Sequence, residues 1–182
     1  MNSYSLSIRY GAIAGGIMIA LMLLLYILSP TSLAGFVGLV FYVPLLFLMI
    51  WGGITARKEN GGYKSFGQAF LTVFIISIMA TMLFDTFGYL LFKVIDPDLP
   101  GLIKAKQLEN TATMMEKFGS SDDQVNEALK RIEDTDFTPT LKSQSLRYAS
   151  SIVIGLILSA LIALFVNRPD AAVLKPEVKP EA

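Results

Sequence analysis

Residues 66–95 of the chain read FGQAFLTVFIISIMATMLFDTFGYLLFKVI, and they are apolar over almost their whole length. The only acidic residue in this stretch is Asp85. Because a helix needs about 20 mostly apolar residues to cross the hydrocarbon core of a bilayer, this stretch is long enough to cross it and continue beyond. We therefore predict a transmembrane helix here with an outward extension.

Three further apolar runs lie at residues 10–28, 33–54 and 148–166. Hydrophobic residues make up 53% of the 182-residue chain and charged residues 16%, and the mean hydropathy is +0.56. A soluble domain carries about 25% charged residues, so this composition indicates a membrane protein. We predict an all-α, polytopic fold with four transmembrane helices.

The first apolar run, residues 10–28, has a second interpretation as a signal peptide. Ser32-Leu33-Ala34 resembles the small-x-small pattern of a cleavage site. The run is longer than the usual apolar core of about 7–15 residues, however, and only Arg9 supplies positive charge before it. These two features favour a retained transmembrane helix.

Lysine and arginine in short loops predict the orientation in the membrane, because cytoplasmic loops carry more of them. The loop at residues 55–65 contains three: Arg57, Lys58 and Lys64. The loop between the first two spans has none. We therefore expect a cytoplasmic N-terminus (1–9), a periplasmic segment (96–147) and a cytoplasmic tail (167–182), which is expected to be disordered because it has no apolar face.

The predicted periplasmic segment, residues 96–147, has the pattern of two short amphipathic helices joined at Gly119-Ser120. Apolar residues recur at helical spacing in the first of them: Leu108, Ala112 and Met115. Ser121 and Gln124 form a capping box that begins the second. This helical hairpin either packs on itself or on the membrane surface, or it is a cap that binds a partner or a ligand.

The residue types present exclude several kinds of chemistry. The chain has no Cys and no His, which excludes disulfides, thiol catalysis and the common histidine-based proteases and metal sites. Lys and Arg number 15, as do Asp and Glu, so no excess of positive charge points to nucleic acid. We expect no enzymatic activity, no cofactor and no metal.

Asp85 is a candidate functional residue, because an ionisable side chain within a span is by default a hypothesis of function. Ala69, Ser77, Thr81 and Asp85 share one helix face. From Phe66 to Asp85 the helix rises roughly 28 Å, which places the carboxylate near the outer headgroups, in reach of water. The face either packs against neighbouring helices or serves a cation- or proton-linked role.

Small residues recur on the first and fourth spans, and Pro44 interrupts the second. Gly11 and Gly15 form a GxxxG pattern, and small residues follow every four positions in the fourth span: Ser151, Gly155, Ser159 and Ala163. Small side chains let helices approach closely, either within one bundle or between two copies of the chain. Pro44 lacks an N–H and predicts a kink near Val40, with a hinge as the functional alternative.

The motif Gly61-Gly62-Tyr63-Lys64-Ser65-Phe66-Gly67-Gln68-Ala69-Phe70, followed later by Ile95-Asp96-Pro97-Asp98, resembles a bacterial membrane family known as domain of unknown function 4199. The resemblance implies a small integral membrane protein of Gram-negative bacteria and no particular activity. The motif's residues predict a tight glycine turn, a Ser65 cap and a Gln68 side chain that bonds across helices. The alternative is a site at the cytoplasmic mouth built on Gln68 and Ser65 with Arg57 and Lys58.

These patterns together predict a multi-pass protein of the inner membrane, with both termini in the cytoplasm. Our first functional hypothesis is a non-enzymatic envelope or accessory protein that acts through contacts with lipid, with a membrane-protein partner or with further copies of itself. The second is a subunit of a transporter or channel for ions or small solutes that uses the polar face around Asp85. A polar cavity that reaches Asp85 would favour the second hypothesis.

Overall fold

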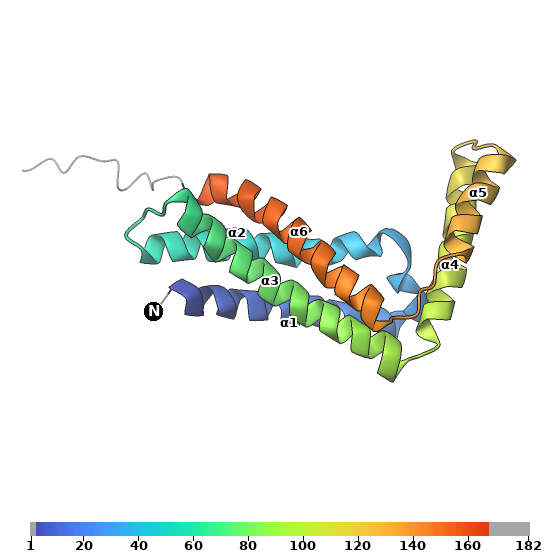
Figure 1. Cartoon of the computed structure of the whole chain (residues 1–182), viewed down its shortest axis with the longest axis horizontal. Helices are drawn as coiled ribbons and strands as arrows, with labels where there is room; N and C mark the ends of the chain where they lie inside the picture. The colour runs from blue at the N-terminus through green and yellow to red at the C-terminus, as the bar shows by residue number, and fades with distance from the viewer. Residues whose placement is uncertain (1–2, 168–182) are drawn as a thin grey trace, which may run out of the picture.

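The computed structural model describes residues 3–167, which form helices and no strand. Four helices are long and apolar enough to cross a membrane. They are α1 (Ser3–Leu28), α2 (Tyr42–Glu59), α3 (Phe66–Leu90) and α6 (Leu141–Val166). Figure 1 shows these four helices side by side along the long axis of the molecule. The all-α fold with four membrane-spanning helices is therefore confirmed.

Helices α1 and α6 extend beyond the apolar runs from which they were predicted. Helix α1 begins at Ser3 rather than at residue 10, and α6 begins at Leu141 rather than at residue 148. Thr140 caps α6, because its Oγ1 accepts a hydrogen bond from the Ser143 amide at 3.1 Å. Hydropathy therefore predicts the apolar part of a helix, whereas capping residues determine where the helix begins.

The second predicted span, residues 33–54, is not one continuous α-helix. Its first part consists of two 3₁₀ segments, η1 (Pro30–Leu33) and η2 (Gly35–Phe41), before α2 begins at Tyr42. Pro44 therefore lies in the first turn of α2, where backbone N–H groups have no acceptor within the helix and proline costs little. The kink predicted near Val40 stays a prediction; the change from 3₁₀ to α-helix at Phe41 and Tyr42 lies close to that position.

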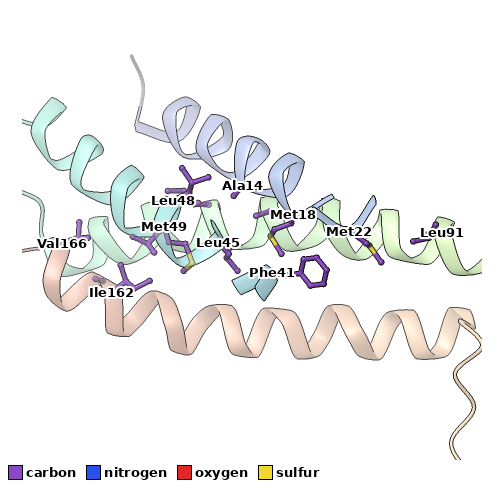
Figure 2. Close-up of a cluster of buried hydrophobic side chains, with 14 of the residues drawn as sticks. Ala14, Met18, Met22, Phe41, Leu45, Leu48, Met49, Leu91, Ile162 and Val166 are labelled. Carbon is purple, nitrogen blue, oxygen red and sulfur yellow. The ribbon is translucent and has the colours of Figure 1, made fainter. Parts of the chain in front are cut away.

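Helix α3 is the centre of the bundle and contacts α1, α2 and α6. The glycines Gly11 and Gly15 of the GxxxG pattern face α3: a Cβ added at Gly11 would lie 2.8 Å from the Ile76 carbonyl oxygen, and one at Gly15 would lie 3.1 Å from that of Ala80. The small residues of α1 therefore pack inside one chain. Figure 2 shows the apolar side chains that fill the space between the helices, Met18, Leu45 and Met49 among them.

The turn between α2 and α3 follows the glycine prediction. Gly61 and Gly62 have φ values of +79° and +85°, which glycine adopts without steric cost. Ser65 then caps α3 in a capping box with Gln68. The predicted turn and cap are confirmed, and they position the start of the central helix.

Two shorter helices, α4 (Leu99–Lys117) and α5 (Asp122–Glu133), pack against each other beyond α3. The turn between them contains Gly119, with φ +70°, and α5 starts with the predicted Ser121–Gln124 capping box. Figure 1 shows this hairpin set across one end of the bundle. The helices and their turn are confirmed, whereas the side of the membrane on which they lie stays a prediction.

Asp96 fixes the start of α4 against the bundle. The Tyr26 hydroxyl of α1 donates to Asp96 Oδ2 at 3.0 Å, and the Leu99 amide donates to Asp96 Oδ1 at 3.2 Å. Between α3 and α4 the chain also passes through a π-helical turn, η3 (Leu91–Ile95). The side chains of Leu99 and Ile103 are buried at this junction, so the hairpin is anchored at its base. The predicted tail lies, apart from Asn167, outside the described residues.

Candidate functional site

The helix face of α3 that contains Asp85 and the small-residue stripe of α6 meet in the interface between these two helices. The Ser151 hydroxyl of α6 donates to Asp85 Oδ2 of α3 at 2.8 Å. A Cβ added at Gly155 would lie 3.0 Å from the Ser77 Oγ, so Gly155 lets the two helices approach closely there. The tertiary structure therefore joins the Asp85 face and the small-residue stripe into one surface of contact.

Asp85 is more deeply buried than its distance along α3 suggested. Only 6% of the residue is exposed, and its main-chain carbonyl oxygen also accepts a hydrogen bond from Gln144 Nε2 at 3.1 Å. The predicted access of the carboxylate to outer water is thus restricted to what reaches it through the cleft described below. Because α6 begins at Leu141, its first turns extend past Asp85 and cover it.

Below Asp85, the α3–α6 interface holds two hydroxyl groups in an apolar environment. Ser77 is 1% exposed and Ser159 is fully buried, and neither Oγ has a hydrogen-bond partner within the described part of the chain. Thr81 instead donates to the carbonyl oxygen of Ser77 at 2.9 Å, within its own helix. The polar face of α3 is thus covered by α6 along its length rather than exposed to lipid.

A cleft of about 1080 Å³ lies at the end of the bundle where α4 crosses it, and Asp85 is one of its lining residues. Its other lining residues come from α1, η1, η2, α2, α3, η3, α4, α6 and the segment before α6. The lining includes six aromatic side chains: Phe41, Tyr42, Phe84, Tyr89, Phe92 and Phe137. A lining that combines aromatic side chains with polar and charged ones suits a ligand that has both an apolar and a polar part.

The cleft exists because α6 packs on α2 at only one end. Gly53 of α2 lies against Val166 of α6, where an added Cβ would be 2.9 Å from a methyl group. At the other end, the ring of Phe41 packs on Phe84 of α3 instead, with 4.9 Å between centroids. Figure 2 shows the same asymmetry: the labelled α6 residues in the core, Ile162 and Val166, both lie toward one end.

Charged side chains line the outer part of the cleft. Arg147 of α6 is exposed and lies close enough to Asp85 for its charge to act on the carboxylate. Lys117 comes from α4, as does Glu109, whose carboxylate pairs with Lys106 at 2.8 Å. Among residues 3–167, no carboxylate oxygen lies within ion-pairing distance of Arg147 or Lys117.

The Gln68 side chain does not bond across helices. Its Oε1 accepts from the Ser65 amide at 3.3 Å within the capping box, and the residue is exposed. Lys64, by contrast, is only 3% exposed, and its Nζ donates to the Thr72 hydroxyl at 2.9 Å. Burial lowers the pKa of the Lys64 ammonium group, and the nearby charge of Glu59 partly opposes this effect.

Of the residues singled out from the sequence, Asp85 and Ser151 line the cleft. Ser77, Thr81, Gly155 and Ser159 lie in the adjoining helix interface, whereas Pro44 and Gln68 line neither. Sequence reasoning missed Gln144 and Arg147, because it began the fourth span at residue 148. The spacing of Gln144, Arg147 and Ser151 on one helix face was the signal that could have found them.

Within the described residues, no three Asp, Glu, His or Cys side chains gather closely enough to hold a metal ion. Residues 9–168 match the model of a protein family described as "Protein of unknown function (DUF4199)". The chain belongs to this family. The match covers most of the chain and confirms the resemblance carried by the glycine motif, but the family description names no activity. No curated protein and no solved structure matches the chain.

Proposed function

We propose that this protein is a non-enzymatic protein of the bacterial inner membrane that acts by holding a membrane lipid in its cleft. Arg57 and Lys58 end α2, and Lys64 precedes α3, so the positive-inside rule supports a cytoplasmic position for this end of the bundle. Both termini are then cytoplasmic, and the cleft opens at the periplasmic leaflet.

The cleft itself is the observation that carries this proposal. Its volume of about 1080 Å³ slightly exceeds the usual range for small-molecule pockets, about 300–1,000 Å³. Aromatic and aliphatic side chains line it together with polar and charged groups, most of which come from α4 and α6. Ile154 on the α6 wall is 41% exposed, which supports entry of an acyl chain from the surrounding bilayer.

A transporter or channel subunit is the second candidate, favoured by the buried Asp85 and the two hydroxyls below it. The packing of the other half of the bundle argues for holding a ligand rather than passing it. There, Gly11 and Gly52 lie so close to α3 that an added Cβ would meet Ile76 atoms at 2.8 and 2.7 Å respectively. We therefore favour a binding protein that is closed at its cytoplasmic end.

Gly88→Leu tests the lipid-binding proposal. Gly88 lines the cleft, and an added Cβ would meet only the end of Met22, at an ordinary contact distance of 3.7 Å. Leucine should therefore fill the cleft without disturbing the helices. Gly16→Leu is the matched control, because a Cβ there meets nothing within 4 Å and Gly16 does not line the cleft.

The measurement is native mass spectrometry of the purified full-length protein after mild detergent extraction. We expect lipid to remain bound to the wild type and to Gly16→Leu, and to be largely lost from Gly88→Leu. Equal lipid retention by all three proteins, or none by the wild type, would contradict the proposal.

A further inference from the structure

The charges at the cleft mouth specify which part of a lipid the site recognises. Resting on the proposed function, we propose that the cleft selects an anionic phospholipid, with the phosphate held by Arg147 and an acyl chain along the aromatic side chains of the lining. Lys117 is the second cation of the lining.

Arg147 is available to a ligand because it forms no ion pair within the described residues, although its charge acts on the Asp85 carboxylate. The nearest buried acid, Asp85, has its Oδ2 bonded by the Ser151 hydroxyl at 2.8 Å, and no ion pair joins it to Arg147. The arginine stays exposed, one helical turn from Ser151 on the side of the mouth. A planar guanidinium in this position suits a phosphate oxygen pair, which it can bind with two parallel hydrogen bonds.

Lys117 supplies a second cation from a different element. It lies on α4, which Figure 1 shows set across the end of the bundle, whereas Arg147 lies at the start of α6. The one acid beside it in the lining, Glu109, is already paired with Lys106 at 2.8 Å. The two cations of the lining, Arg147 and Lys117, therefore have no ion-pair partner among the described residues.

Asp85 sets the depth at which a headgroup can bind. It is the buried acidic residue of the lining, and its ionised form repels an anionic phosphate from the interior and leaves that space to a neutral chain. The walls beside it include Met22, Phe84 and Ile154, which offer an apolar surface to such a chain. Cations at the mouth and an acid below them thus match an anionic headgroup with an acyl tail.

The test compares the retention of two lipids by the full-length protein reconstituted with equal amounts of phosphatidylglycerol and phosphatidylcholine. We expect the wild type to retain phosphatidylglycerol preferentially in native mass spectra. Arg147→Gln should lower that preference about tenfold, as expected for losing a charge-assisted hydrogen bond. Lys117→Gln should lower it less, because a single flexible ammonium binds phosphate without fixed geometry.

Lys142→Gln is the matched control, because Lys142 lies on the same helix as Arg147 but does not line the cleft. It should leave the preference unchanged. If Arg147→Gln keeps the wild-type preference while Gly88→Leu loses lipid, the headgroup inference fails and the lipid-binding proposal survives. Displacement of bound lipid by excess inorganic phosphate would also overturn the inference, since it would indicate a site for the free anion.

Discussion

The two halves of the four-helix bundle consist of similar apolar helices but differ in how closely these helices pack. In the half that contains residues 73–80 of α3, glycines bring the helices so close that a single added carbon would collide with a neighbour. In the half that contains residues 84–92, aromatic side chains and a 3₁₀ segment keep α6 apart from η2, and a cleft results.

We expect the largest loss of stability when a glycine in the closely packed half is replaced by a larger residue. In Gly11→Leu, the new Cβ would lie 2.7 Å from Met79 Cβ and 2.8 Å from the Ile76 carbonyl oxygen. Overpacking of this kind costs about 1–3 kcal/mol, occasionally more. We expect a lower midpoint of thermal unfolding in detergent, whereas Gly16→Leu, with open space around it, should unfold like the wild type.

A smaller effect is expected where the two halves meet, at the hydrogen bond between Ser151 and Asp85. Ser151→Ala leaves the buried carboxylate without its hydroxyl donor, which should cost about 1–2 kcal/mol. The neighbouring Ser150→Ala is the control, because the Ser150 hydroxyl only donates to the Leu146 carbonyl of its own helix. Equal unfolding midpoints for the two variants would show that the bond contributes nothing to the α3–α6 interface.

The smallest effect concerns Lys64 at the closely packed end, and it depends on pH. Because burial lowers the pKa of Lys64 below its ordinary 10.5, the unfolded chain binds more protons than the folded chain between the two values. Stability should therefore rise slightly with pH across that window. Lys64→Met keeps the apolar stem and removes the charge, so a series of unfolding midpoints measured at increasing pH should lose this contribution.

Sequence reasoning succeeded where the deciding interactions are local. Helix-forming apolar runs, the glycine turn at Gly61-Gly62 and the capping boxes at Ser65 and Ser121 depend on residues a few positions apart, and the structure contains all of them. Local reasoning failed at Gln68. This residue sits in the first turn of α3, where its side chain takes part in the capping box instead of bonding to another helix.

The amino-acid sequence alone determined that the chain has four apolar helices long enough to span a membrane, because the length and apolarity of each run are properties of that run. It also determined which residues are small enough or polar enough to face another helix. The cleft is a different matter, because it depends on how far α6 diverges from η2 and on where α4 crosses the bundle. Asp85 and Arg147 are 62 positions apart by number, and only the packing of α3 on α6 makes them parts of one site.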